Sequence, residues 1–375
     1  MKGVSVFLLP RTHSLHMALN ISNPFRFHHS QGSKHVEFKC LSPRRHAKTL
    51  AMVTRFPGVD NELQKILDAD MDHVSARRRA RESFKDIQLG IDHILFKTRC
   101  DGLEVKESYE VNSRGVEIFY KSWLPGIARP KAIVFYCHAY GDTCTFFFEG
   151  IARKLACAGY GVFAMDYPGF GLSEGLHCYI PSFDSLVDDV IELYSKIKEN
   201  TEFRSLPSFL FGQSMGGAIA DGMVPPKLLA QILFGIATIL PKQKLFPQKK
   251  LSVAAFRDLK KREMTAYNVI GYRDKPRLRT AVEMFKTTQE IEQKLEQVSL
   301  PLLILHGEAD IVTDPSVSKT FYEKASSSDK KLKLYKDAYH SLLEGELDEI
   351  IIQVLSDIVS WLDEHSFKHS SSSDK

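Results

Sequence analysis

Several protein classes are excluded by what this 375-residue sequence lacks. Its six cysteines include no C-x-x-C pair and no zinc-ligand spacing, so we expect no metal site and reduced thiols in a reducing compartment. The longest apolar candidate for a membrane span, residues 228–240, is too short, and residues 4–9 are too short for a signal-peptide core. A net charge of only +4 gives no strongly basic surface for nucleic acid.

Acidic residues are almost absent from residues 1–59, where Glu37 is the only one. Arginines lie there among serine, threonine and histidine, a composition typical of organelle transit peptides. The alternative is a disordered basic arm without a targeting function. We expect a chloroplast location if the segment is a transit peptide, and a cytoplasmic or peripheral membrane location otherwise. Either way, we expect these residues to be dispensable for folding.

The rest of the chain is long enough for one large α/β domain with additional segments. Residues 60–84 have a helical apolar period, and Arg77, Arg78, Arg79 and Arg81 follow at its end, where we expect a solvated surface or, alternatively, contact with an acidic membrane. Residues 107–123 indicate a hairpin. Strand and helix patterns then alternate from residue 132 to residue 365, which predicts a mainly parallel sheet with helices on both faces.

The most informative motif is Gly-Gln-Ser-Met-Gly at residues 212–216. It fits G-x-S-x-G, the nucleophile elbow of α/β hydrolases, in which small neighbours allow a sharp turn that exposes the serine. An apolar run at residues 208–211 precedes it, as a buried strand would, and small residues that can open a helix follow. Ser214 is therefore the candidate nucleophile.

A serine nucleophile needs a base, and α/β hydrolases place the acid and the histidine after the serine in the chain. Asp310 follows the predicted strand at residues 302–305, and His340 lies five residues beyond the predicted strand at residues 332–335. We assign Asp310 to orient the imidazole and His340 to act as general base and then acid.

Other residues compete for these roles. His306 is the rival base, but it lies directly at a strand end and fits a structural role better. Asp337 is the rival acid, although it lies on the same loop as His340, and Asp314 is available as a helix N-cap. For the oxyanion hole we expect the backbone N–H groups of Met215 and of Tyr140, the latter in the loop after the strand at residues 132–137.

The chain resembles the plant monoacylglycerol lipases, the group that includes caffeoylshikimate esterase. The resemblance covers about residues 60–366, and it rests on the elbow and four further motifs, at residues 138–142, 165–175, 306–310 and 337–341. It implies hydrolysis of a carboxylic ester, no cofactor, a small-molecule acyl ester or lipid substrate and a cap over an acyl pocket.

Two departures from the family pattern stand out. Ala139 replaces the glycine of a His-Gly pair in the oxyanion loop, where an added methyl could constrain the backbone. After Ala220, about two dozen residues are lacking, those of a helix and a central strand that would pair between the elbow strand and the strand before Asp310. We expect a gap between these strands, their direct pairing, or recruitment of residues 232–240.

The resemblance and the gap together predict an organisation for the whole chain. We expect residues 1–59 to be an arm, 60–104 a helical segment, 105–220 and 299–366 two parts of an α/β-hydrolase core, 221–298 a cap, and 367–375 a flexible tail. The cap carries Lys242, Lys244, Lys249 and Lys250 beside apolar residues, so it fits either a lid resting on lipid or a cap packed on its own domain.

The predicted activity is cleavage of monoacylglycerol into fatty acid and glycerol through an acyl-enzyme. Three alternatives stay open: acyl transfer to a lysolipid or alcohol, a caffeoylshikimate-type esterase, and an impaired splice variant that acts as a binding or decoy protein.

Overall fold

The computed structural model describes residues 6–11, 60–97, 101–126, 128–214, 237, 240–244, 251–292 and 295–372. Its strands are β1 (Val6–Arg11), β2 (Leu103–Val111), β3 (Glu117–Pro125), β4 (Ile133–Cys137), β5 (Gly161–Met165), β6 (Ser208–Gln213), β7 (Leu302–Gly307) and β8 (Lys330–Tyr335). Its helices are α1 (Asn61–Leu67), α2 (Val74–Leu89), α3 (Phe147–Cys157), α4 (Phe183–Glu199), α7 (Leu251–Ala255), α8 (Leu259–Met264), α9 (Leu278–Glu292), α10 (Pro315–Lys324) and α11 (Asp348–Ser372), with short 3-10 turns η1 (Thr265–Tyr267) and η2 (Leu295–Gln297).

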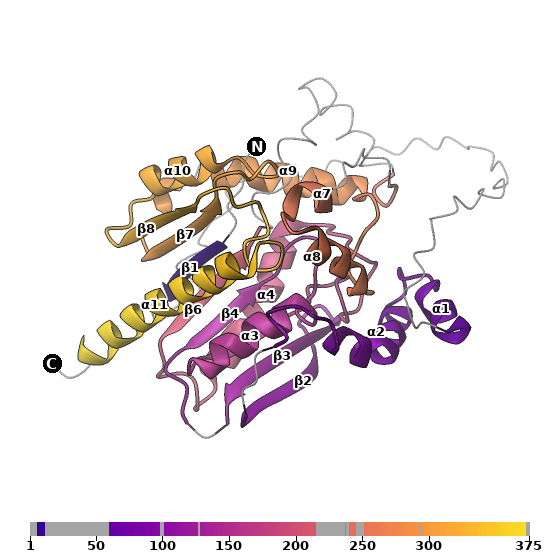
Figure 1. The fold of residues 1–375 in the computed structure, drawn as a ribbon, viewed down its shortest axis with the longest axis horizontal. Helices are drawn as coiled ribbons and strands as arrows, with labels where there is room; N and C mark the ends of the chain where they lie inside the picture. Colours follow the sequence, from indigo (N-terminus) through magenta and orange to yellow (C-terminus); the bar gives the residue numbers. More distant parts are fainter. Residues whose placement is uncertain are drawn as a thin grey trace, which may run out of the picture.

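The eight strands form one sheet in the order β2-β3-β5-β4-β6-β1-β7-β8 (Figure 1). The pairs β5–β4, β4–β6 and β7–β8 are parallel, whereas β2, β3 and β1 run antiparallel to their neighbours. The hairpin predicted at residues 107–123 is present as β2 and β3, and the predicted strands and helices between residues 132 and 365 are confirmed. The chain therefore has the α/β-hydrolase fold that the sequence predicts.

Both faces of the sheet are covered by apolar clusters. Successive residues of a strand point to opposite faces, so neighbouring residues of β4 belong to different clusters. Val134 and Tyr136 of β4 belong to a cluster with residues of α3 and α11, whereas Ile133 and Phe135 pack with residues of α4. Burial on both faces explains why β4 and β5 are continuous apolar runs rather than alternating ones.

The expected missing strand requires a correction. The elbow strand β6 and β7 do not pair directly, and no gap lies between them. Instead, β1 occupies the position between the two strands (Figure 1). β1 pairs antiparallel with β6 over Val6–Arg11 and with β7 over residues 6–8. Residues 6–11 thus belong to the sheet and not to an arm outside it, whereas the dispensability of residues 1–59 for folding stays a prediction. The suggested substitute, residues 232–240, lies mostly outside the described residues.

The arginines after the first helical period also differ from expectation. They lie inside α2, and Arg77 and Arg81 are buried rather than solvated. Arg78 forms an ion pair with Glu117 at 2.6 Å. Only Arg79 of the four is exposed, so these residues do not form the solvated cationic surface that was predicted.

Two smaller expectations also change. The tail predicted to be flexible from residue 367 continues α11 as far as Ser372. Cys137, Cys144 and Cys178 are free thiols, but Cys157 is disulfide-bonded, contrary to the expectation of reduced cysteines throughout. None of the described helices is long and apolar enough to span a membrane.

Candidate active site

The predicted nucleophile follows directly after the end of β6. Ser214 has a φ of 55°, one of three positive values at non-glycine residues in the described part of the chain. A serine in this conformation stores strain, as the G-x-S-x-G turn requires when it exposes the hydroxyl above the sheet. The backbone geometry therefore agrees with the nucleophile elbow that the sequence predicts.

The structure brings the three predicted residues of the triad together. The Oγ atom of Ser214 lies 2.8 Å from Nε2 of His340, and Nδ1 of His340 lies 2.8 Å from Oδ2 of Asp310. The three residues follow the carboxyl ends of β6, β7 and β8, the edge at which α/β sheets bind ligands. Nδ1–H of His340 can donate to Asp310 while Nε2 accepts the serine proton, which is the arrangement a general base needs.

Asp310 is held as a carboxylate by several donors. The backbone N–H groups of Val312 and Thr313 donate to Oδ1 at 2.8 and 2.9 Å, and the Thr313 hydroxyl donates to Oδ2 at 2.6 Å. Burial alone would raise the pKa of Asp310, but hydrogen bonds from His306 and His340 outweigh it and hold the pKa well below its usual range. Asp310 is therefore ionised wherever His340 can act as a base.

His306, the rival base, lies behind Asp310 and is fully buried. Its Nε2 atom is 3.0 Å from Oδ2 of Asp310, and its Nδ1 atom is 2.6 Å from the hydroxyl of Ser318. These contacts fit a residue that supports the acid, a role the sequence did not reveal. The rival acid Asp337 is exposed, and Asp314 is the N-cap of α10, as predicted.

Gly307 explains how the acid and the base come so close. A Cβ atom at this position would lie 2.3 Å from the carbonyl oxygen of Ala338 and 2.4 Å from that of Tyr339. The loop that carries His340 can therefore pass over the end of β7 only because residue 307 has no side chain.

The oxyanion loop is shaped by aromatic packing and by the cap. The ring of Tyr140 packs edge-on against Phe170 and Tyr272, and the backbone N–H of Tyr272 donates to the carbonyl of Gly141 at 2.7 Å. Ala139 is not among the described residues with positive φ, so its methyl group meets no glycine-specific conformation. Met215, the other predicted donor, lies outside the described residues, and the role of the Tyr140 N–H stays a prediction.

Sequence reasoning missed a polar chain beneath the nucleophile. The Tyr136 hydroxyl donates to Oε1 of Gln213 at 2.6 Å, and Nε2 of Gln213 donates to Oε1 of Glu344 at 2.6 Å. Burial raises the pKa of Glu344 to about 7. This series of hydrogen bonds links Gln213, the residue before Ser214, to the loop that carries His340. A glutamate placed directly after two leucines, Leu342 and Leu343, which are buried in the structure, was the available signal.

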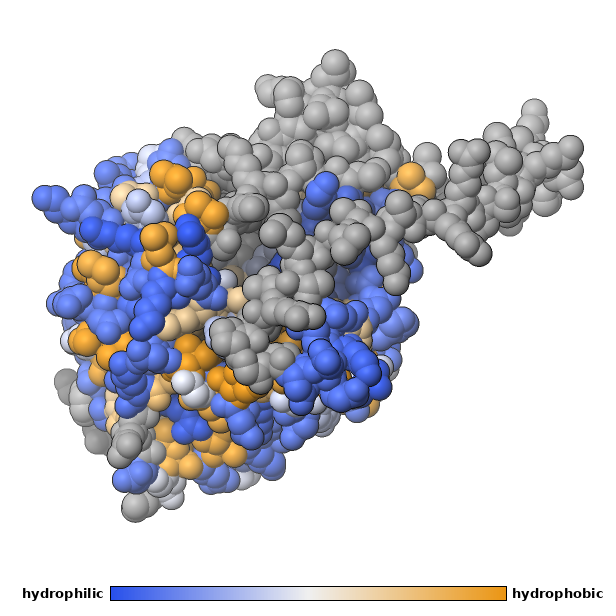
Figure 2. Space-filling model, turned by 45° about the vertical axis from the view of Figure 1, so that its right-hand side comes forward, coloured by the Kyte–Doolittle hydropathy of each residue, from blue (hydrophilic) through white to orange (hydrophobic). Residues whose placement is uncertain are grey.

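The described part of the cap packs on the hydrolase core. The Asn268 side chain donates to Asp142 of the oxyanion loop at 3.0 Å, and the backbone N–H of Ser341 donates to Ala255 at 2.9 Å. Val253 and Leu259 are exposed apolar residues of the cap. In the view of Figure 2, the described surface is mainly hydrophilic, with hydrophobic residues in small groups.

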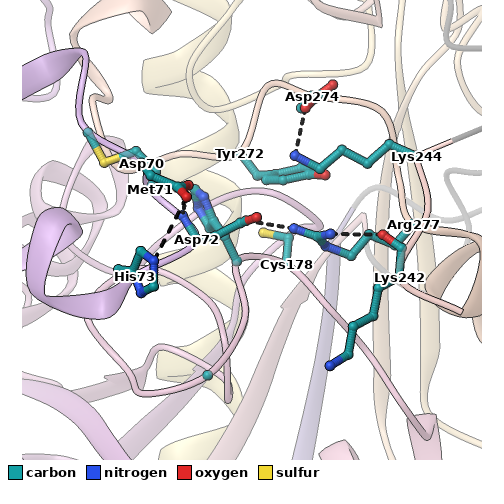
Figure 3. A network of polar contacts seen from close by, with 12 residues as sticks. Asp70, Met71, Asp72, His73, Cys178, Lys242, Lys244, Tyr272, Asp274 and Arg277 are labelled. Carbon is teal, nitrogen blue, oxygen red and sulfur yellow. Dashed lines mark hydrogen bonds and ion pairs between the residues drawn. The ribbon is translucent and has the colours of Figure 1, made fainter. Parts of the chain in front are cut away.

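A polar network also connects the cap to the N-terminal helical segment (Figure 3). Arg277 is buried, and it forms an ion pair at 2.6 Å with Asp72, which lies between α1 and α2. Its Nη1 atom also donates to the carbonyl of Lys242 at 2.9 Å, and Lys244 pairs with Asp274 at 2.7 Å. The helical segment is therefore tied to the cap by a buried ion pair.

The described residues include no group of three or more histidine, cysteine, aspartate or glutamate side chains arranged to hold a metal ion. The chemistry that the arrangement supports is that of Ser214, His340 and Asp310 themselves.

Comparison with known proteins gives matches across the hydrolase core. The profile of the family described as serine aminopeptidase, S33, matches residues 128–225 and 221–348. The two matches meet at the point where the sequence predicts a missing helix and strand. Caffeoylshikimate esterase of Arabidopsis thaliana is 34% identical over 298 residues, which covers 72% of this chain and 89% of that protein. Monoglyceride lipase of Homo sapiens is 30% identical, covering 68% of this chain and 90% of the lipase.

Solved structures show the same fold at lower identity. A soluble variant of monoglyceride lipase from Saccharomyces cerevisiae, in complex with a substrate analog, aligns with a TM-score of 0.61 at 20% identity. That alignment covers 72% of this chain and 97% of the lipase. The monoacylglycerol lipase of Paleococcus ferrophilus aligns with a TM-score of 0.54 at 22% identity, over 66% of this chain and 99% of the lipase.

Proposed function

Because the chain belongs to the serine aminopeptidase S33 family, whose relatives here include esterases and lipases, we propose that it hydrolyses carboxylic esters through an acyl-enzyme on Ser214. The observation that carries this proposal is the hydrogen-bonded series from Ser214 through His340 to Asp310. Monoacylglycerol is the first candidate substrate.

The geometry supports a two-step reaction. His340 takes the Ser214 proton on Nε2 as Oγ attacks the ester carbonyl carbon, and Asp310 stabilises the imidazolium that forms. Collapse of the tetrahedral intermediate breaks the bond to the alcohol, which leaves with the proton from His340. Water then gives a proton to His340 and attacks the acyl carbon. The bond from that carbon to Oγ of Ser214 breaks, Oγ takes the proton back from His340, and the fatty acid is released. Backbone N–H groups near Tyr140 are suited to hold the oxyanion.

The relatives favour two substrate classes. Monoglyceride lipases support a glycerol monoester, and the relative named caffeoylshikimate esterase supports a hydroxycinnamoyl ester as the second candidate. Exposed Val253 and Leu259 on the cap favour the lipid, because they can approach an acyl chain or a lipid surface. Peripheral contact of the cap with a membrane belongs to the same proposal.

The direct test is labelling of the full chain with a fluorophosphonate, which reacts with activated serines. We expect one labelled residue, Ser214, and loss of both labelling and ester hydrolysis in Ser214→Ala, on the order of 10⁴-fold or more. Ser113→Ala, at an exposed turn, is the matched control. Hydrolysis that persists in Ser214→Ala would remove Ser214 from the mechanism.

Substrate choice requires a second assay. Rates on a monoacylglycerol and on a caffeoyl ester would be compared, with glycerol or lysolipid added in parallel to detect acyl transfer. Faster release of fatty acid from the monoacylglycerol, with water as the preferred acceptor, is the expected result. A chain that neither labels nor hydrolyses any of these esters would favour the decoy alternative.

A further inference from the structure

The sheet consists of two parts that carry different members of the triad. β2, β3, β5, β4 and β6 form one part, and Ser214 follows its last strand. β7 and β8 form the other part, and Asp310 and His340 follow those strands. In the described sheet, β1 is the strand that joins the two parts.

β1 is paired on both sides where the join is made. Val6, Phe7 and Leu8 face Gln213, Gly212 and Phe211 of β6, and they also face Leu305, Ile304 and Leu303 of β7. From Leu9 onward β1 pairs with β6 alone. Pro10, which has no N–H to donate, therefore lies where β1 has one neighbour, as strand prolines require.

The spacing of the strands makes β1 necessary for the triad. Neighbouring strands lie about 4.8 Å apart, so β6 and β7 stand about 9.6 Å apart with β1 between them. Closing the sheet without β1 would move the Asp310 side about 4.8 Å relative to Ser214. The Ser214–His340 hydrogen bond of 2.8 Å fits only the spacing with a strand in between.

The sequence indicates both the position of the missing strand and a segment that can take its place. The chain is short of a strand after Ala220, where the two family matches meet, and residues 4–9 form an apolar run. A short continuous apolar run suits a strand buried in a sheet.

We infer that residues 6–11 replace the missing internal strand within the same chain, so that the active hydrolase retains these residues. This inference deepens the proposed function, because it names the element that holds the nucleophile beside its base. It also excludes the removal of residues 1–59 from the active form, as cleavage of a transit peptide would require. An address function is compatible with β1 only if the segment stays attached.

A disulfide cross-link tests the pairing without relying on activity. Leu9 and Leu210 face each other in the register, so oxidation of the variant Leu9→Cys with Leu210→Cys should join the two peptides within one chain, as read by mass spectrometry. Pro10→Cys with Leu210→Cys is the matched control, because adjacent strand residues point to opposite faces. Equal cross-linking of both pairs, or of neither, would overturn the inference, and a cross-link between two chains would show that a second copy supplies the strand.

Proline substitution tests the consequence for the site. At Leu8, proline removes an N–H from a strand with neighbours on both sides, so Leu8→Pro should slow fluorophosphonate labelling of Ser214 at least tenfold. Ser14→Pro, outside the strand, should label like the unaltered chain. Equal labelling of the two variants would overturn the inference and leave the proposed function intact. A specific cross-link in a chain that never labels would instead support the strand and remove the esterase.

Discussion

Asp310 receives donors from two histidines, and only one of them reaches the nucleophile. His340 connects Asp310 to Ser214, whereas His306 contacts Asp310 from the buried side and Ser318 beyond it. The two imidazoles can therefore be distinguished by their effects on catalysis.

We expect Asp310→Asn to lower ester hydrolysis by about 10⁴-fold with the fold retained, because an amide N–H facing Nδ1 favours the wrong tautomer of His340. His306→Ala should cost about tenfold or less in rate, because Asp310 keeps its other donors. Steady-state hydrolysis and circular dichroism of both variants give the comparison. A loss in His306→Ala as large as in His340→Ala would show that the base is assigned wrongly.

At the scale of single residues, Glu344 makes the free energy of unfolding depend on pH. Its folded-state pKa is raised to about 7 by burial, so the folded state binds its proton more tightly than the unfolded state does. The stability associated with that proton is complete below the unfolded pKa, near 4.3, and is lost as the pH rises through 7.

Glu344→Gln keeps an oxygen that accepts from Gln213 and removes the titration. We therefore expect little change in unfolding free energy at pH 4 and a gain relative to the unaltered chain at pH 8, at most about 4 kcal/mol. Urea unfolding at both pH values measures it, with the exposed Glu349→Gln as control. A gain at pH 4 that equals the gain at pH 8 would contradict the titration of Glu344.

At the scale of elements, α2 is anchored by one buried guanidinium. Arg77 donates to the carbonyls of Gly171 at 2.6 Å, Ser173 at 2.7 Å and Met71 at 2.8 Å. The bonds to Gly171 and Ser173 tie α2 to the loop after β5, whose carbonyl groups would otherwise be buried without donors.

Arg77→Ala should lower the unfolding free energy by about 3 kcal/mol or more, because several buried carbonyls lose a charged donor at once. Arg79→Ala, two residues along the same helix and exposed, should change it by less than about 0.5 kcal/mol. Denaturant titration of the pair is the measurement. If the two variants lost similar amounts of unfolding free energy, the hydrogen bonds of the Arg77 guanidinium would contribute little to stability beyond the helix propensity of arginine in α2.

Sequence patterns predicted elements well where local and global requirements agreed. The elbow, the strands before Asp310 and His340, and the hairpin have signals within a few residues of themselves. The apolar run at residues 4–9 can suggest a strand, but nothing near it indicates where that strand pairs, because its partners on β6 and β7 are about 200 and 300 residues away in sequence. The burial of Arg77 likewise depends on a loop about 95 residues later in the sequence. The charged residues of α2 therefore predicted a solvent-exposed surface, although the guanidinium of Arg77 forms hydrogen bonds inside the protein.

At the scale of the whole molecule, the vacancy after Ala220 and β1 compete for one position in the sheet. A version of the chain with the family's helix and strand restored after Ala220 should place the restored strand between β6 and β7. We therefore expect the Leu9→Cys, Leu210→Cys cross-link to disappear in that version while fluorophosphonate labelling is kept. A higher melting temperature should accompany it, because a complete strand and helix bury more apolar side chains, each contributing about 1.5–3 kcal/mol. If the cross-link persisted, β1 would keep its position beside β6 even when the family's own strand is present.

The position of β1 in the sheet also fixes the order in which the protein can be completed during synthesis. Val6 leaves the ribosome well before its partner Leu305, which is translated about 300 residues later. At about 10 residues per second, the apolar segment waits roughly 30 seconds for the second of its two neighbours. For about the first 20 seconds, until β6 is made, it has no strand neighbour at all and is of the kind that chaperones bind. Completion of the catalytic site is thus a late event that joins the start of the chain to its last third.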